Sequence, residues 1–582
     1  MTQAGPQVEK KGVVRQLTEV ATLLEVLGAE PFRANAYAAA ARSLDAYDGD
    51  FAALFAGRRL HELRGVGKSL AAEMYALNGS PRLAVLDELY AQVPPGVRGL
   101  LRVSGLGPKK ARQLWLNGVA DPAELVAAAQ DGRVAKLRGF GAKSAAVLGE
   151  AAAFALRGAA RLRLDQAEAF ADLFEAVFMR ALPEAALYWA GELRRKLETV
   201  GALEAVVVGA ATAELSAALA EFGPEPHGSG AGVTSLFGGR EVTLYPVSDD
   251  VLGAAIVFRT GDAAFVGALA ARAEKRGLSL TGTGLSEGGR TLPTPAETDV
   301  FARLGLPYAP PERRDVPLTL SAEVPAADLV TFSDVRGLVH NHTSWSDGAV
   351  PLREMVAQAR GLGYSYLALA DHSKTSYYAN GLSVERVFAQ AKEVAAVREE
   401  LRDEGSNFAL LHGMEVDIMP DGGLDYPDEV LATLDYAVVS VHQHFTLAKT
   451  KQTERVVRAV HNPHAGILAH PTGRLLLQRP GYEIDLEAVL RACAETGTVV
   501  ELNASPYRLD LDWRVARRAL ELGCRFSVDP DAHHPDGYDD VRYGVLMARK
   551  AGLRAADIVN TAPTAAAFLA RLKPAPGRRG PY

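Results

Sequence analysis

The spacing of apolar residues differs between successive parts of this 582-residue chain. In residues 1–160, Ala-rich amphipathic stretches stop at Gly, Pro and Asn, which predicts an all-helical region with short turns. In residues 335–572, short apolar runs rich in β-branched and aromatic residues alternate with longer amphipathic stretches. Such runs are typical of buried parallel strands, so this part predicts seven strands in an α/β barrel. Its expected helices include 352–362, 384–403 and 486–495.

The region between these parts, residues 161–312, has a mixed pattern. The expected elements are helices at 166–182 and 188–200 and strands at 205–208, 242–246 and 254–259. Helices interspersed with short strands predict an α+β domain. A Pro-rich segment around Pro310 is expected to end it.

Length and composition predict a multidomain protein, because 582 residues with 48% hydrophobic content exceed one core. Cys493 and Cys524 are the two cysteines, so neither a disulfide framework nor a thiolate metal site is expected. Without a signal-peptide pattern or a bilayer-length apolar stretch, we expect a cytoplasmic protein with no membrane partner. The net charge is −7, yet residues 98–163 hold twelve Lys or Arg against four Asp or Glu, a balance suited to a phosphate backbone.

Three turns in the helical region share one pattern, Gly-apolar-Gly followed by Lys at a helix start. Their first glycines are separated by 40 and then 34 residues. Glycine permits the tight turn, and the helix offers free N–H groups and its positive dipole end for phosphate. One such turn is more often structural, but three in a basic region predict binding to the DNA backbone without reading sequence. The residues are Gly65, Gly67, Lys68, Gly105, Gly107, Lys109, Lys110, Gly139, Gly141 and Lys143.

Nine His, Asp and Glu residues in the barrel region each follow closely on an apolar run. They are His340, His342, Asp347, His372, Glu415, His442, His470, Asp531 and His533. Because the carboxyl ends of parallel strands open at one mouth of a barrel, these side chains are expected to converge there. Imidazole with carboxylate suits Zn²⁺, Mn²⁺ or Fe²⁺, so the pattern predicts a polynuclear metal hydrolase. Four further histidines nearby, expected to be solvated or to support the ligands, are His444, His461, His464 and His534.

The motifs around these residues resemble those of PHP (polymerase and histidinol phosphatase) domains. They read HNHTSWSDG, ALADHS, HGMEVDI, SVHQHF, ILAHPTGR and DPDAHHPDGYDDVRYG. The order of three Gly-apolar-Gly turns, an α+β region and these motifs resembles the bacterial and archaeal family X DNA polymerases, relatives of DNA polymerase beta. The resemblance implies a lyase-like helical domain at 1–95, a fingers-like helix-hairpin-helix domain at 96–160, a nucleotidyltransferase-like palm at 161–260, a thumb at 261–314, a linker at 315–334, a distorted TIM-like (βα)7 PHP barrel at 335–572 and a disordered tail at 573–582.

The same resemblance implies a site for three divalent ions. His340, His342, Glu415 and Asp531 would surround the first, Glu415 would bridge to a second held by His442 and His470, and Asp347, His372 and His533 would surround the third. Relatives use such a site, often with Mn²⁺, as a 3′–5′ exonuclease and to incise abasic sites. The implied partner is gapped, nicked or abasic duplex DNA with its 3′ ends. Other repair proteins are further candidate partners, and a monomer is expected.

The palm departs from the family pattern. Family X polymerases hold two Mg²⁺ with three aspartates, but alignment places Ala202, Glu204 and Thr243 at those positions. Glu192 takes the place of the phosphate-binding Ser. Two-metal nucleotidyl transfer needs several carboxylate oxygens, so Mg²⁺ binding at the palm and polymerase activity are expected to be weak or lost. Glu73 stands where the lyase lysine is expected, and a carboxylate forms no imine, so lyase activity is expected to be weak or absent.

The preferred hypothesis is therefore a DNA-repair nuclease whose PHP domain hydrolyses phosphodiesters. A second hypothesis is a working gap-filling polymerase with the PHP domain as proofreader. A third is a non-catalytic DNA-binding scaffold that uses its metals for stability. A small-molecule phosphatase is a fourth, but it would leave the DNA-directed half of the chain without a purpose.

Overall fold

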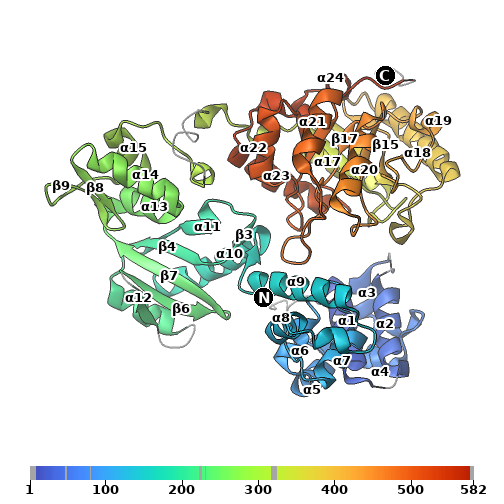
Figure 1. Ribbon diagram of the computed structural model, residues 1–582, viewed down its shortest axis with the longest axis horizontal. Helices are drawn as coiled ribbons and strands as arrows, with labels where there is room; N and C mark the ends of the chain where they lie inside the picture. The colour runs from blue at the N-terminus through green and yellow to red at the C-terminus, as the bar shows by residue number, and fades with distance from the viewer. Residues whose placement is uncertain are drawn as a thin grey trace. The chain divides into compact units, whose positions relative to one another are not determined.

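The computed structural model describes residues 8–576 except 9, 30, 46, 48, 79, 81, 222–225, 230 and 316–323. The chain divides into two compact units, Met1–Ala160 with Leu477–Arg479, and Arg161–Leu476 with Pro480–Tyr582. Figure 1 labels their elements. Among the described residues, no helix has both the length and the apolar character needed to span a bilayer.

The first unit is all-helical, as the sequence predicts. Its α-helices are α1 (Lys10–Leu27), α2 (Pro31–Asp45), α3 (Phe51–Ala56), α4 (Lys68–Tyr75), α5 (Ala84–Gln92), α6 (Pro95–Leu100), α7 (Pro108–Leu116), α8 (Pro122–Gln130) and α9 (Ala142–Ala159). Buried apolar side chains form two separate cores, one between Val13 and Val97 and one between Leu100 and Ala152. The unit therefore consists of two small helical bundles in sequence.

The second unit begins with an α+β region. One sheet has the strand order β2 (Ala186–Trp189), β4 (Leu203–Val208), β7 (Arg240–Val247), β6 (Gly232–Phe237) and β5 (His227–Ser229). Helix α10 (Leu164–Ala181) buries Phe174 and Phe178 in the core of this region. The following elements are α12 (Thr212–Ala220), α13 (Leu252–Thr260), α14 (Ala263–Glu274), the hairpins of β8 (Leu278–Thr281), β9 (Gly284–Glu287) and β10 (Arg290–Leu292), and α15 (Glu297–Leu304).

Two element predictions in this region were wrong. The helix expected at 188–200 is instead the end of β2, the short helix α11 (Gly191–Arg194) and β3 (Thr199–Val200), which pairs with β1 (Leu162–Arg163). Gly191 has a φ of 58°, which no helix continues through. The strand expected at 254–259 lies within helix α13, where Gly253 to Val257 are all buried. A continuous apolar run does not separate a buried strand from a buried helix.

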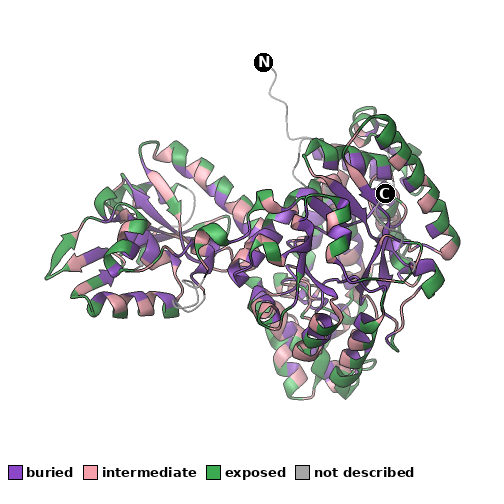
Figure 2. Ribbon diagram, turned by 90° about the horizontal axis from the view of Figure 1, so that it is seen from above, coloured by how far each residue is buried: buried purple, intermediate pink, exposed green. Residues whose placement is uncertain are grey.

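The barrel has the seven parallel strand runs that the sequence predicts. They are β11 (Gly337–Asn341), β12 with β13 (Tyr366–Leu369, Asp371–His372), β14 with β15 (Ala409–Leu411, Gly413–Asp417), β16 (Tyr436–Ser440), β17 (Ile467–Leu468), β18 (Val499–Asn503) and β19 (Phe526–Asp529). A parallel bridge between Asn341 and Ala532 brings the first and last runs together. The surrounding helices are α17 (Leu352–Gly361), α18 (Val384–Asp403), α19 (Asp428–Leu431), α20 (Lys449–His461), α21 (Leu486–Thr496), α22 (Trp513–Glu521), α23 (Val541–Ala551) and α24 (Ala565–Arg571). Figure 2 shows the strands buried and the outer helix faces exposed.

The predicted linker and tail are partly described. Residues 316–323 of the linker and 577–582 of the tail lie outside the described residues. Later in the linker, Leu329 and Val330 are buried, and the Val330 N–H donates to Leu553 O at 3.0 Å. Lys573, placed in the tail, is also buried, and its Nζ donates to Val460 O at 2.7 Å.

Candidate metal centre

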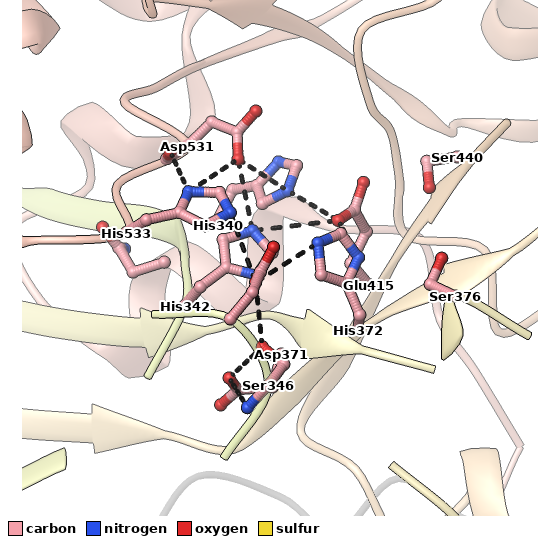
Figure 3. Close-up of polar contacts among 12 residues, drawn as sticks. His340, His342, Ser346, Asp371, His372, Ser376, Glu415, Ser440, Asp531 and His533 are labelled. Atoms are coloured by element: carbon pink, nitrogen blue, oxygen red, sulfur yellow. Dashed lines mark hydrogen bonds and ion pairs between the residues drawn. The ribbon is translucent and has the colours of Figure 1, made fainter. Parts of the chain in front are cut away.

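The structure brings all nine predicted residues together at the carboxyl end of the barrel strands. Figure 3 labels His340, His342, His372, Glu415, Asp531 and His533 among them. Each belongs to a group whose ligand atoms lie within 4.8 Å of one another. The groups are His340 with Glu415 and His470; His340 with His342 and Asp531; His372 with Glu415 and His442; and His342 with Asp347, His372 and His533. Residues far apart in sequence therefore form one continuous cluster.

Glu415, on β15, lies in the middle of this cluster. Its Oε1 lies 2.9 Å from Nε2 of His470 and 3.2 Å from Nε2 of His442. Its Oε2 lies 3.0 Å from Nδ1 of His372 and 3.3 Å from Nε2 of His340. Because one carboxylate faces imidazoles from four strand runs, it has the arrangement of a bridging ligand.

Two further carboxylates complete the cluster on its other side. Oδ1 of Asp531 lies 3.2 Å from Nε2 of His342. Asp347 comes from the loop after β11, and its Oδ1 lies 3.3 Å from Nε2 of His533 and 3.5 Å from Nε2 of His372. The His342 and His533 rings stack with centroids 4.1 Å apart, so a positive charge on one ring disfavours a positive charge on the other.

The donor atoms fit divalent metal ions, because several are buried without a hydrogen-bond partner. They include His340 Nε2, His342 Nε2, His372 Nδ1 and Glu415 Oε2. An unsatisfied buried polar atom costs about 1–3 kcal/mol, and native proteins keep few of them. Cations between these facing atoms would satisfy them together. PHP domains bind several metal ions, and the described clusters agree with that property.

Two acids that the sequence analysis missed orient the histidines from behind. Nδ1 of His340 lies 2.5 Å from Oε1 of Glu501 on β18, and Nδ1 of His442 lies 2.9 Å from Oδ1 of Asp417 on β15. A carboxylate at one ring nitrogen sets the tautomer and turns the other nitrogen toward a metal. The signal was present in the sequence, since each acid interrupts an apolar strand, VVELN and GMEVD.

Asp371 organises the loop that carries Asp347, and it too was missed. Its carboxylate accepts hydrogen bonds from Thr343 N at 2.8 Å, Ser346 Oγ at 2.6 Å and Gln390 Nε2 at 2.6 Å. Figure 3 shows Asp371 and Ser346 beneath the ligand cluster. This buried acid therefore supports the site without facing its metal-ligating atoms.

The pKa values of the clustered groups favour ionised carboxylates, whereas the imidazoles differ from one another. Burial opposes protonation of His340, His372, His442 and His533, but the facing carboxylates outweigh it and raise the pKa of each ring. Burial, followed by the His533 and His372 rings, lowers the pKa of His342 to about 3. Burial opposes the ionisation of Glu415, but His442 and its neighbours hold the pKa of that carboxyl well below its usual range. Neutral imidazole and ionised carboxylate are the forms that bind metal.

Three of the nine residues have left-handed backbone conformations. The φ angles are 61° at His340, 26° at His470 and 53° at Asp531. Such conformations cost non-glycine residues on the order of 1–3 kcal/mol each and concentrate at functional sites. At His470 the backbone N–H donates to Oε2 of Glu501 at 2.6 Å, which holds the strained residue in place.

The other nearby histidines lie outside these clusters, as expected. His444 and His461 are exposed, and His534 accepts a hydrogen bond from Asp536 N at 3.2 Å. His464 is buried rather than solvated. Within the described part of the chain, none of the four belongs to a group of metal-ligating atoms.

Comparison with known proteins assigns the chain to a family. It is 32% identical over 562 residues to the Bacillus subtilis protein named DNA polymerase/3′-5′ exonuclease PolX, covering 95% of this chain and 97% of that relative. The chain belongs to the PolX group of family X DNA polymerases. Family models match a helix-hairpin-helix domain at 9–77, a SAM-like helix-hairpin-helix tandem at 97–152, a DNA polymerase beta thumb at 255–315 and a PHP domain at 339–505. The family and fold class predicted from the motifs are confirmed.

The PHP part of this PolX-family chain is also similar to smaller proteins. A probable phosphatase of Acetivibrio thermocellus is 30% identical over 190 residues, covering 32% of this chain and 69% of that relative. Probable phosphatase Teth514_1060 of Thermoanaerobacter sp. (strain X514) is 29% identical over 162 residues, covering 26% and 64%. The barrel therefore has relatives that match it without the N-terminal regions.

The three helix-hairpin-helix turns share one backbone geometry. Their first glycines are left-handed, with φ of 84° at Gly65, 80° at Gly105 and 84° at Gly139. Their second glycines cap α4, α7 and α9 with φ of −75° at Gly67, −77° at Gly107 and −96° at Gly141. The neighbouring lysines Lys68, Lys109, Lys110 and Lys143 are exposed. Each turn thus presents helix N–H groups beside a lysine, the arrangement that binds a phosphate backbone.

The three residues that the sequence analysis predicts at the palm positions lie on or beside two neighbouring strands. Glu204 on β4 pairs in register with Thr243 on β7, and Ala202 is exposed just before β4. The Tyr245 hydroxyl donates to Oε1 of Glu204 at 3.1 Å, and Oγ1 of Thr243 lies 2.8 Å from Oγ1 of Thr234. Of the three aligned positions, Glu204 alone carries a carboxylate, and a neighbouring phenol bonds to it.

Glu192 and the following arginine are also engaged within the chain. Oε2 of Glu192 accepts hydrogen bonds from Gly201 N at 2.7 Å and from Arg161 Nη2 at 2.9 Å. Arg194 donates to both oxygens of Glu297 on α15, at 2.6 and 2.9 Å. These contacts place a negative charge at the aligned phosphate position and direct Arg194 toward the thumb.

Glu73, predicted to stand at the position of the lyase lysine, lies on α4. The Tyr37 hydroxyl donates to Oε2 of Glu73 at 2.7 Å. Burial and then this carboxylate raise the pKa of Tyr37 to about 12. Lys68 is exposed at the first position of the same helix.

Proposed function

We propose that the PHP barrel hydrolyses DNA phosphodiesters as a 3′–5′ exonuclease and at abasic sites, with polymerase activity weak or lost. The observation that carries this proposal is the convergence of nine His, Asp and Glu side chains around Glu415. The B. subtilis relative, named as both polymerase and 3′–5′ exonuclease, supports it over nearly the whole chain. The helix-hairpin-helix turns support gapped, nicked or abasic duplex DNA as the partner.

The ligand chemistry supports a site for three divalent ions, with Mn²⁺, Zn²⁺ or Fe²⁺ as candidates. The proposed assignment follows the family resemblance and is His340, His342, Glu415 and Asp531 for one ion, Glu415, His442 and His470 for a second, and Asp347, His372 and His533 for a third. The short distances from Glu415 to His340, His442 and His470 and from Asp347 to His533 support it. When bound, such ions lower the pKa of water, orient a phosphodiester and stabilise the leaving oxygen.

The chain's own residues orient the ligands and hold the substrate. Glu501 and Asp417 keep the rings of His340 and His442 turned into the site. Nε of Arg508, after β18, lies 3.4 Å from Oδ2 of Asp531, and its side chain is 20% exposed. A guanidinium at this rim can donate to the oxygens of a substrate phosphate while the carboxylate keeps it oriented.

A second candidate function is template-directed gap filling with the barrel as proofreader. The match to a polymerase beta thumb and the name of the B. subtilis relative favour it. The palm argues against this function, because Glu204 is the single carboxylate at the three positions predicted to hold Mg²⁺. Glu204 would then be indispensable.

One gapped duplex, labelled at the 5′ end of the upstream strand, separates the two functions. The purified protein is incubated with Mn²⁺ or Mg²⁺, with and without nucleotides, beside the variants His342→Ala and Glu204→Ala. The proposal expects shortening of the labelled strand in every wild-type reaction, lost in His342→Ala and kept in Glu204→Ala. Steady lengthening with nucleotides, lost in Glu204→Ala and kept in His342→Ala, would establish the polymerase instead.

A further inference from the structure

Two exposed tyrosines stand on the loop that follows β13. Tyr377 is 80% exposed and Tyr378 is 60% exposed, and their ring centroids lie 6.0 Å apart with planes at 78°. Aromatic rings are large apolar surfaces, and adjacent exposed ones mark interaction sites. The position of the Tyr377 and Tyr378 rings in the fold indicates what kind of molecule they bind.

The loop that carries these rings borders the metal centre. Ser376, directly before them, donates from Oγ to Oδ2 of Asp417 at 2.6 Å and lies 3.4 Å from Nδ1 of His442. Figure 3 shows Ser376 beside Glu415. Burial of its hydroxyl raises the pKa of Tyr378 to about 12, and the carboxylates of Asp417 and Glu415 contribute to the rise. The loop is therefore anchored beside the ligand cluster by Ser376, while Tyr378 remains open to solvent.

Hydrogen bonds from several elements hold the loop in shape. The Thr375 N–H donates to Asp425 Oδ2 at 2.7 Å, and Gln443 Nε2 donates to Thr375 O at 2.7 Å. On its far side, Arg386 Nη1 donates to Asn380 O at 2.8 Å. The rings are thus presented by a braced segment, which lowers the entropy lost when a ligand settles on them.

We propose that Tyr377 and Tyr378 stack against the bases of an unpaired 3′ end and make single-stranded 3′ termini the preferred substrate of the metal centre. This inference rests on the proposed function. Base–aromatic stacking contributes about 1–3 kcal/mol per base and tolerates any sequence. In a duplex the faces of the bases are already stacked, so the rings select frayed or unpaired ends.

The surroundings favour nucleic acid over a protein partner. Lys374 is exposed on the same loop, so a cation accompanies the rings. Aromatic rings beside cations form the combination that binds single strands. The loop that carries the rings also borders the predicted ligand cluster through Ser376, and the end of a strand must lie in that cluster to be cut.

The test removes the two tyrosine rings from the protein and the terminal bases from the substrate, separately and together. The double variant Tyr377→Ala/Tyr378→Ala is assayed on a single-stranded oligonucleotide and on the same oligonucleotide with its last two bases removed. We expect kcat/KM on the intact strand to fall about 10- to 100-fold, mainly through KM, with no change on the strand that lacks bases. The variants Tyr377→Phe and Tyr378→Phe should retain wild-type rates. Phe332→Ala removes a ring that is 48% exposed before β11 and should change nothing.

Equal rates of wild type and double variant on the intact strand would overturn the inference, as would equal losses on both strands. Binding of a protein partner by the two tyrosines, combined with no effect of the double variant on the oligonucleotides, would also overturn it. A second readout is independent of cleavage, the quenching of 2-aminopurine at the 3′ end when the oligonucleotide binds. If wild-type protein cleaves neither strand, the proposed function fails. Quenching that the double variant loses would still support stacking, and equal quenching would refute it.

Discussion

The carboxylate of Glu501 lies 2.5 Å from Nδ1 of His340, although 161 residues separate them in the chain. The same carboxylate accepts the backbone N–H of His470 at 2.6 Å. Burial, and then the charge of Glu501, raise the pKa of the neighbouring Asp529 well above its usual range. One buried acid therefore orients two of the nine predicted ligands.

Replacing this acid should weaken metal binding. Glu501→Gln preserves size but removes the charge that orients His340, and we expect metal affinity and hydrolysis to fall about 10- to 100-fold. Metal titration of chelator-treated protein measures the affinity. Glu400→Gln, which removes an exposed acid paired with Arg353, is the control and should match wild type. An unchanged affinity in Glu501→Gln would show that the contact does not support the site.

Protonation of the Glu297 carboxylate should destabilise the palm and thumb at acidic pH. Burial opposes its ionisation, but hydrogen bonds from Arg194 and the charge of Arg314 lower its pKa to about 2. Because this pKa lies below that of the unfolded chain, the stabilisation is present above about pH 4.5 and disappears as pH falls toward 2. We expect Glu297→Gln to cost about 3 kcal/mol at pH 7 and roughly half of that at pH 3.

Urea unfolding of wild type and Glu297→Gln across pH 3–7 measures this difference. Glu62→Gln removes an acid of an exposed ion pair with Arg59 and serves as the control, with little effect at any pH. A cost for Glu297→Gln that stays constant with pH would contradict the assignment.

The helix-hairpin-helix lysines should contribute to the salt dependence of DNA binding. Lys109→Ala/Lys143→Ala should reduce the slope of log affinity against log salt by about 2, with similar losses on all sequences. Fluorescence anisotropy on a short duplex at several salt concentrations measures the slope. Lys392→Ala on α18 removes an exposed lysine of the barrel and is expected to leave it unchanged.

Arg508 should affect substrate binding without affecting metal content. Arg508→Ala removes a charged donor to phosphate, worth about 1.5–3 kcal/mol, so kcat/KM should fall about 10- to 100-fold. Elemental analysis should find the same metal content as in wild type. Loss of metal along with activity would make Arg508 a support for Asp531 rather than a phosphate contact.

The positions of the nine predicted residues follow from the sequence because each stands within or closely after an apolar run. Such runs predict parallel strands, and parallel strands bring their carboxyl ends together. Glu501 lies within β18 as Glu415 lies within β15, but only Glu415 belongs to a motif that resembles the family pattern, so Glu501 was not selected. Its role appears only once β18 lies beside β17 in the sheet.

The errors in the α+β region have a similar origin. Helix α13 carries an unbroken apolar run because neighbouring elements cover it on all sides, which removes the periodicity that identifies a helix. Around Gly191, a single left-handed residue divides a stretch whose composition suits a helix. In both cases tertiary contacts determine the secondary structure, and the local sequence pattern does not show those contacts.

The central claim is tested most directly by counting metal ions while following the cutting of DNA. Elemental analysis of the purified protein is run beside hydrolysis of a 5′-labelled single strand, before chelation, after chelation and after Mn²⁺ is returned. We predict up to three ions per chain and hydrolysis from the 3′ end that disappears and returns with them. A fully loaded protein that leaves single-stranded, gapped and abasic DNA intact would contradict the account.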